Sequence, residues 1–182
     1  MVIRHKADFP LISVRRREGE PIERMVVERL RKMGHTLSVA ESCTGGLLAS
    51  RITSVEGCSG VFLEGFILYS NEAKLKRLCL SESTIQLYGV VSKEVVMQMA
   101  ERLLHISGTH HALCTTGLAG PTGGTQQIPI GTVFIGLASQ HADVKVCKEF
   151  FPRTPRESFK QLAVDAALDM LLCRLNLIRL HK

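Results

Sequence analysis

Aromatic side chains and long apolar runs are scarce in this sequence of 182 residues. It has no tryptophan and two tyrosines, so we do not expect the groove of stacking aromatics that single-stranded nucleic acids require. No apolar run approaches the ~18 residues of a membrane span. The N-terminus also lacks an unbroken apolar stretch followed by a small-residue cleavage site, so no secretion signal is expected. These absences predict a cytoplasmic protein with no membrane partner.

The sequence also lacks the paired spacing of metal-binding cysteines. Its six cysteines include no C-x-x-C pair, which argues against a zinc or iron–sulfur site. Without a secretion signal, reduced thiols are the default. His110 and His111 are neighbours on an expected strand, so their side chains point to opposite faces and do not share one metal ion. We therefore expect no metal and no cofactor.

Positive charge is in excess and gathers near the N-terminus. The formal net charge is +6, and residues 1–34 carry nine lysines or arginines against five acids. A solvated basic lead-in over residues 1–19 is the simpler interpretation, and a DNA-binding arm is the alternative. The chain is 45% apolar, which is enough for one hydrophobic core, so we expect a single domain over residues 20–182.

Hydrophobic periodicity alternates between strand and helix through the first two thirds of the chain. Helical signals are found at 21–33, 47–55, 70–78, 81–87, 91–106 and 157–175, and strand-like runs at 36–40, 61–69, 110–116, 132–138 and 144–150. The β-rich run at 61–69 is expected as a central strand. This order predicts a three-layer α/β/α sandwich on a mixed, mostly parallel sheet with one antiparallel hairpin. Ligands of such folds bind at the carboxyl ends of strands.

The segment Glu41–Gly46 (ESCTGG) lies between an expected strand and an expected helix. Its glycines allow close backbone approach, and the N–H groups of Thr44, Gly45 and Gly46 are expected to be free at the helix start. Such donors bind a phosphate or a developing oxyanion. Ser42 is then a candidate nucleophile, and an ordinary helix cap is the alternative. A Walker A loop is not indicated, because its lysine is missing.

Lys74 is the candidate base for that serine. It follows Asn71 by three residues, in the first turn of the helix expected at 70–78, where the helix dipole and partial burial both lower a lysine pKa. A neutral amine there accepts the proton of Ser42. The alternative is an exposed helix lysine like Lys76.

Residues 117–131 (GLAGPTGGTQQIPIG) are too rich in glycine for a simple hairpin. Loops of this length inside compact domains are usually functional or mobile. Exposed amides suit a polar or phosphorylated ligand, as do the threonine hydroxyls at positions 115, 116, 122 and 125. A loop without a ligand is the alternative.

Four long motifs occur in order along the chain: LSVAESCTGG (37–46), EGFILYSNEAK (64–74), YGVVS (88–92) and TGLAGPTGGTQQIPIGTV (116–133). Together they resemble the C-terminal domain of the competence/damage-inducible CinA family, the nicotinamide-nucleotide deamidases. The resemblance extends from about residue 22 to about residue 176. The family's molybdopterin-binding-like N-terminal domain has no counterpart here, so the stand-alone form is expected.

The resemblance implies hydrolysis of nicotinamide mononucleotide to nicotinate mononucleotide and ammonia, with Ser42 and Lys74 as the catalytic pair. It also implies a substrate-binding role for the positions that match the family's site: Thr44, Gly45, Gly46, Tyr69, Asn71, Thr116, Gly117, Gly120, Gly123 and Gly124. The expected partner is a pyridine mononucleotide, and nucleic acid is not expected. A homo-oligomer stays open, because no feature of the sequence identifies an interface.

Two positions depart from the family pattern. Ile128 stands where the family usually has a lysine, and Pro155 stands at the apparent place of the arginine in a Gly-Asp-Arg triplet. If those basic groups hold the substrate phosphate, Arg153, Arg156 or backbone amides must replace them. The departures also motivate a different class of function, a catalytically silent nucleotide-binding or regulatory module of the same fold.

Overall fold

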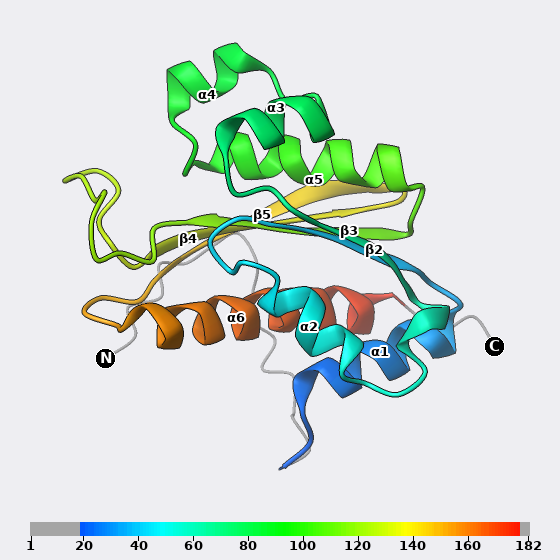
Figure 1. Ribbon diagram of the computed structural model, residues 1–182. Helices are drawn as coiled ribbons and strands as arrows, with labels where there is room; N and C mark the ends of the chain where they lie inside the picture. The colour runs from blue at the N-terminus through cyan, green and yellow to red at the C-terminus, as the bar shows by residue number, and fades with distance from the viewer. Residues whose placement is uncertain (1–18, 179–182) are drawn as a thin grey trace.

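The computed structural model describes residues 19–178, so the basic lead-in expected at 1–19 falls outside it except for Gly19. A five-stranded sheet in the order β2-β1-β3-β4-β5 forms its middle layer (Figure 1). The strands are β1 (Leu37–Glu41), β2 (Phe62–Ile67), β3 (His111–Gly117), β4 (Thr132–Ser139) and β5 (Ala142–Phe150). β1 pairs parallel with β2 and β3, whereas β4 pairs antiparallel with β3 and β5. Only β4 is therefore reversed, and the sheet is mixed and mostly parallel, as predicted.

Helices cover both faces of the sheet and complete the predicted three layers (Figure 1). One face carries α1 (Ile22–Met33), α2 (Leu47–Thr53) and α6 (Arg156–Leu177), and the other carries α3 (Asn71–Leu78), α4 (Glu82–Tyr88) and α5 (Lys93–Ser107). A cluster of buried apolar side chains fills the space on each face. Within residues 19–178, no helix combines the length and the apolar character that a bilayer crossing needs.

Capping residues fix the helix ends near the predicted positions. α1 follows Pro21 and ends at Gly34, whose φ of 66° closes the last turn. The hydroxyl oxygens of Ser70 and Ser92 accept backbone hydrogen bonds at the starts of α3 and α5. The cap at Ser70 fixes where α3 begins, and it therefore fixes the face of α3 on which Lys74 lies.

The expectation of a central strand at 61–69 is wrong, because β2 is an edge strand paired only with β1. Its residues alternate between half-buried and exposed positions, whereas β1 and β4 are buried along their whole length. A β-rich run predicts a strand but does not fix its place in the sheet, since side-chain packing and burial differ between edge and central strands.

Three segments that the sequence singles out follow the carboxyl ends of β1, β2 and β3. They are residues 42–46, residues 68–70 and the loop 118–131. Because these strands are mutually parallel, their carboxyl ends meet at one edge of the sheet, on the left in Figure 1. This edge is where ligands bind in folds of this class.

Candidate active site

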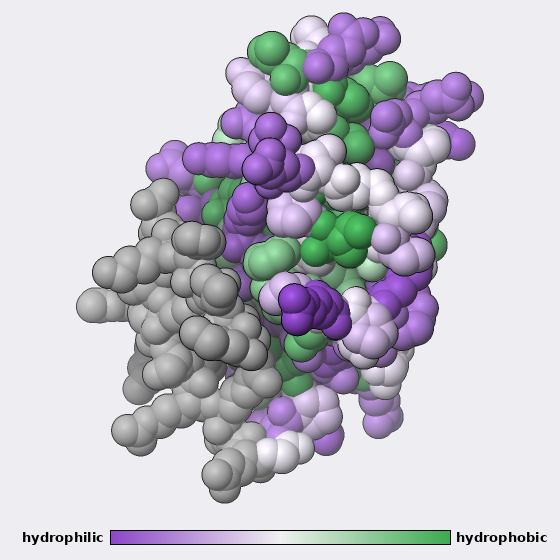
Figure 2. Space-filling model, turned by 90° about the vertical axis from the view of Figure 1, so that its left-hand side faces the viewer, coloured by the Kyte–Doolittle hydropathy of each residue, from purple (hydrophilic) through white to green (hydrophobic). Residues whose placement is uncertain are grey.

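A cavity of about 260 Å³ opens at this edge of the sheet. Figure 2 looks onto the same side of the molecule, where hydrophobic and hydrophilic groups lie close together. The lining residues are Ser42, Cys43, Tyr69, Asn71, Lys74, Val90, Val91, Thr116, Gly117, Leu118, Ala119, Gly120, Thr122 and Arg156. The fold thus brings Ser42 and Lys74 into one cavity from segments that follow different strands.

Ser42 is the first residue after β1, at the start of the turn into α2. Its N–H donates to the carbonyl oxygen of Thr115 at 3.2 Å, and its own carbonyl accepts from the N–H of Gly45 at 3.2 Å. The neighbouring Thr44 is buried, with its hydroxyl oxygen 2.9 Å from that of Thr115. The backbone on both sides of Ser42 is therefore tied to β3, while its half-buried side chain reaches the cavity.

Lys74 is a lysine with almost no exposed surface, 1% of its side chain and backbone together. Its ammonium nitrogen lies 3.5 Å from the Ser70 carbonyl oxygen, and no carboxylate in residues 19–178 forms an ion pair with it. Burial lowers the pKa of Lys74, and the nearby Cys43 opposes that shift. The alternative of an exposed helix lysine is wrong.

Cys43 is the residue that competes with Ser42 as a nucleophile. Burial raises the pKa of its thiol to about 12, and the neighbouring Glu41 charge adds to that rise. Hydrogen bonds and the proximity of Lys74 pull the same pKa down but do not outweigh burial. A thiol in this state is protonated near neutral pH and is a poor nucleophile.

The free amides expected at the start of α2 are present only in part. The N–H of Gly46 donates to the Glu41 carboxylate at 3.0 Å, and the N–H of Gly45 donates to the Ser42 carbonyl. Neither Gly45 nor Gly46 lines the cavity, and Thr44 does not line it either. The prediction of three free donors is therefore wrong for both glycines, because an internal carboxylate and a turn use them.

The glycine-rich loop after β3 contributes its first part to the cavity and not its tip. A Cβ atom at Gly117 would lie 2.7 Å from the Thr132 carbonyl oxygen and 3.1 Å from the Cys43 sulfur. Only glycine lets β3 approach the Ser42 turn so closely. Gly120 also lines the cavity, but Gly123 and Gly124 do not. Thr116 lines it while its hydroxyl donates to the Val90 carbonyl oxygen at 2.9 Å.

The two candidate arginines have different positions. Arg156, the first residue of α6, donates to the Gly120 carbonyl oxygen at 2.8 Å and to the Tyr69 hydroxyl at 2.5 Å. It thereby links the segments that follow β2 and β3 at the cavity mouth. Arg153 is exposed, has a φ of 54° and does not line the cavity. Of the two, Arg156 is the cation placed to meet a ligand.

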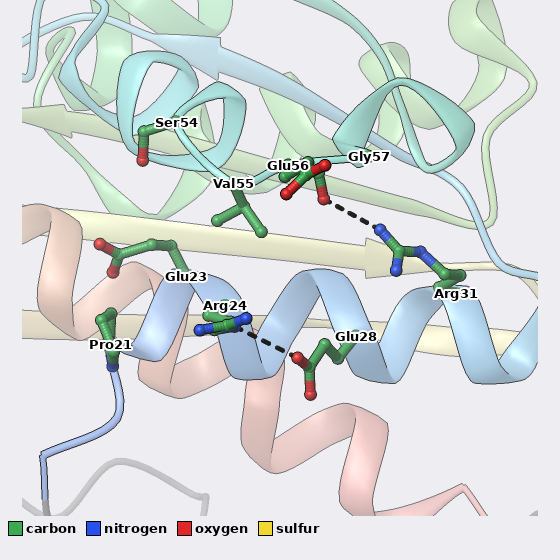
Figure 3. A pocket seen from close by; sticks show the side chains of 9 residues that line it. All are labelled: Pro21, Glu23, Arg24, Glu28, Arg31, Ser54, Val55, Glu56 and Gly57. Carbon is green, nitrogen blue, oxygen red and sulfur yellow. Dashed lines mark hydrogen bonds and ion pairs between the residues drawn. The ribbon is translucent and has the colours of Figure 1, made fainter.

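A larger, open groove of about 720 Å³ lies elsewhere, between α1 and residues 54–57 (Figure 3). Charged side chains of this groove interact with other groups of the protein. Arg24 pairs with Glu28, and Arg31 donates to the Glu56 carbonyl oxygen. None of the predicted site residues lies in this larger groove, so the smaller cavity is the better candidate site.

Several lining residues were not predicted as site residues. Val90 and Val91 belong to the YGVVS motif, and Leu118 and Ala119 to the glycine-rich loop, so the motifs contained them without indicating that they face the cavity. Cys43 also lines the cavity. These apolar residues make part of the cavity lining hydrophobic.

Known proteins share both the sequence and the fold. The CinA C-terminal domain matches residues 19–175. A CinA-like protein of Kosmotoga olearia is 52% identical over 118 residues, which are 65% of this chain and 29% of that protein. A CinA-like protein of Chlorobaculum tepidum is 46% identical over 158 residues, 85% of this chain and 37% of that protein. The chain thus spans less than two fifths of the length of these relatives.

A solved structure shares the fold of this chain. The competence/damage inducible protein CihA from Agrobacterium tumefaciens superposes with a TM-score of 0.81 at 34% sequence identity, and the match covers 85% of this chain and 95% of that one. Residues 19–175, which the CinA C-terminal domain matches, include every strand of the sheet and the segments that form the cavity. The chain belongs to the CinA C-terminal domain family.

Proposed function

We propose that this protein hydrolyses the carboxamide of a pyridine mononucleotide, converting nicotinamide mononucleotide to nicotinate mononucleotide and ammonia. The observation that carries the proposal is the pairing of Ser42 with a buried lysine in one cavity. Burial lowers the pKa of Lys74, and no described carboxylate holds its charge. An amine in that environment is able to accept a proton, which is what a serine nucleophile needs.

The proposed reaction has two steps with a covalent intermediate. The Ser42 hydroxyl oxygen attacks the carboxamide carbon while the Lys74 amine takes the hydroxyl proton. The tetrahedral intermediate collapses, the C–N bond breaks, and Lys74 returns the proton to the departing nitrogen, so that ammonia leaves. Water then attacks the acyl ester while Lys74 takes its proton, the C–O bond to Ser42 breaks, and Lys74 returns the proton to the Ser42 oxygen as the carboxylic acid is released.

Donors for the oxyanion are fewer than the sequence alone suggests. Of the amides expected at the α2 start, those of Gly45 and Gly46 have partners within the protein. The Thr44 amide is the remaining member of that set. Thr44 does not line the cavity, so this set of amides supplies no free donor that faces the attacking oxygen.

Size and charge of the cavity support a small anionic substrate. A volume of about 260 Å³ is near the lower end of ligand pockets and accommodates a ring rather than a polymer. Arg156 at the mouth supplies the cation for a phosphate group. A cytoplasmic location, where such nucleotides occur, is part of the same proposal.

Ammonia release from nicotinamide mononucleotide tests the proposal directly. We expect turnover by the wild-type chain, a loss of about a thousandfold in Ser42→Ala, and no change in Ser50→Ala, an exposed serine on α2 used as the matched control. Mass spectrometry of a quenched reaction should find the acyl group on the peptide that contains Ser42. Equal turnover in Ser42→Ala and the control would remove Ser42 from the mechanism.

The second candidate is a nucleotide-binding module without turnover. The position that usually carries a lysine in the family holds Ile128, which packs against the apolar cluster under α5 and supplies no charge. Binding of nicotinamide mononucleotide without ammonia release would favour this module. Binding together with turnover that depends on Ser42 would exclude it.

A further inference from the structure

Glu41, the last residue of β1, is a fully buried carboxylate immediately before Ser42. Acidic side chains are almost never fully buried unless their oxygens have partners. Here the partners are backbone amides: Oε2 accepts from Gly46 and Leu48 at 3.0 Å each, and Oε1 accepts from Ala49 at 2.8 Å. No lysine or arginine in residues 19–178 forms an ion pair with it. The start of α2 therefore binds a carboxylate that belongs to the chain itself.

These hydrogen bonds close a ring around the turn that carries Ser42. The main chain of Glu41 is fixed within the sheet, where its carbonyl oxygen accepts from the Leu68 N–H at 2.7 Å. Its carboxylate reaches forward to amides five, seven and eight residues later. Both ends of the segment 42–45 are thus held by one side chain. The φ of 96° at Gly46 turns the backbone so that its amide meets the carboxylate.

The charge of Glu41 matches the place it occupies. α2 has no acidic residue in its first turn, and its N-cap residue, Gly46, has no side chain with which to cap it. The positive end of the helix dipole is therefore satisfied by Glu41. The side chain does not line the cavity, and its oxygens already accept three hydrogen bonds. It is consequently not placed to act as an acid or base on a bound molecule.

We propose that Glu41 is a positioning residue that holds Ser42 in the orientation needed for attack. This inference rests on the proposed function only in taking Ser42 as the nucleophile. It deepens that function by assigning the helix N-terminus to an internal anion. A substrate phosphate then has no place at the start of α2 and binds at the mouth instead, where Arg156 lies.

The reaction of Ser42 with a fluorophosphonate probe tests the proposal without requiring that the substrate be known. The labelling rate, normalised to the folded fraction from circular dichroism, reports how well Ser42 is presented. Glu41→Gln keeps the shape but loses the charge and one acceptor oxygen. Glu41→Asp keeps the negative charge, so this variant is expected to fold. Its side chain is shorter by one methylene group. Glu82→Gln removes an exposed carboxylate from the first turn of α4 and is the matched control.

We expect both Glu41 variants to label Ser42 about tenfold to a hundredfold more slowly, because small displacements of reacting groups cost that much. The control should match the wild type within about twofold. Hydrogen exchange should show faster exchange at Gly46, Leu48 and Ala49 in the Glu41 variants alone. Wild-type labelling rates in folded Glu41 variants, or no labelling of wild-type Ser42, would overturn the proposal. Labelling that depends on Glu41 in a chain that does not hydrolyse nicotinamide mononucleotide would retain this inference and reject the proposed substrate.

Discussion

The two ends of β1 and β3 both carry buried ionisable side chains, but these side chains face different surroundings. At the carboxyl end, Lys74 lies against an open cavity. At the amino end, three histidines face one another. His35 Nδ1 lies 3.0 Å from His111 Nε2, and the rings of His35 and His110 stack with centroids 4.5 Å apart. Thr36 and Ser139 provide further hydrogen bonds to His110 and His111.

Burial lowers a pKa at both ends, and this similarity shows what a perturbed pKa does not reveal. Burial is the main reason that the pKa of His111 falls to about 3, and it is also the cause of the fall at Lys74. The histidines have internal partners, and no group of three potential ligands in the described part of the chain is placed to hold a metal ion. The cavity, rather than the shifted pKa, distinguishes a candidate active site from a packed polar cluster.

Replacement of Lys74 gives the largest expected effect. Lys74→Arg keeps the positive charge but does not lose its proton near neutral pH, so it should lower kcat by about 10²–10⁴-fold. Lys74→Met removes the amine and should also be inactive, because no base is left to take the proton of Ser42. Lys76→Arg, at an exposed position of the same helix, serves as the control in the ammonia assay. If Lys74→Arg turned over at close to the wild-type rate, Lys74 would not be the base.

The pH profile should reveal the lowered pKa of Lys74. In the proposed mechanism the neutral amine is the active form, so kcat/KM should rise about tenfold per pH unit and level off above that pKa. Because burial lowers the pKa, the plateau should begin below the ordinary lysine pKa of about 10.4. The limb should persist unchanged in His111→Asn. If the pKa of this limb changed in His111→Asn, the two ends of the strands would be coupled, contrary to our expectation.

Acid stability should depend on the histidine end instead. The unfolded chain protonates His111 below a pKa of about 6.5, but the folded chain resists protonation until about pH 3, because burial and the nearby His35, His110 and Arg174 oppose it. The unfolding free energy should therefore fall as pH drops through this window, by up to about 1.4 kcal/mol per pH unit.

Urea unfolding at pH 7 and pH 4.5 measures this dependence. His111→Asn should be less stable than the wild type at pH 7, because it loses packing and a hydrogen bond, but it should lose less on acidification. His105→Asn, at an exposed position on α5, is the control. Equal losses in the wild type and in His111→Asn would contradict the assignment.

Replacement of Cys43 should have the smallest effect on turnover. Its thiol pKa of about 12 leaves almost no thiolate at neutral pH. Cys43→Ala should therefore keep activity within about threefold, with a loss of stability of about 1 kcal/mol from the small cavity created. Ammonia release and thermal unfolding of the same preparation check both values. A loss comparable to that of Ser42→Ala would transfer the nucleophile to the sulfur.

The sequence predicts the layers of this fold because period and capping are local properties. The ends of α1, α3 and α5 follow from Pro21, Gly34, Ser70 and Ser92, which act within one turn of themselves. The place of β2 in the sheet was predicted wrongly, because strand order depends on which strand each one pairs with and not on its own residues. Four of five strands point one way, which the alternation of elements did predict.

For the site, the sequence predicts residues near strand ends but not the direction of their side chains. Ser42, Lys74 and Arg156 line one cavity, whereas Gly123, Gly124 and Arg153 do not. Glu41 received no role, because nothing local indicates that a strand residue will bind amides up to eight positions later. The amides of Gly45 and Gly46 were expected to be free for the same reason. Hydrogen bonds that depend on how the chain turns back are not encoded in spacing alone.

Helix α6 extends from the carboxyl ends of β1 and β3, where the cavity lies, toward their amino ends. Its 22 residues span ~33 Å, with Arg156 at the cavity mouth, and Arg29 of α1 donates to the carbonyl oxygens of Leu175 and Ile178 at 3.2 Å each near the far end. Because α6 packs along α1 and the sheet, it resists tilting. Adjustment of the mouth then involves the exposed Arg156 and Tyr69 side chains, and their rotation requires that the hydrogen bonds of Arg156 to Tyr69 and to Gly120 break first. A rearrangement of these two side chains at the mouth requires no domain closure.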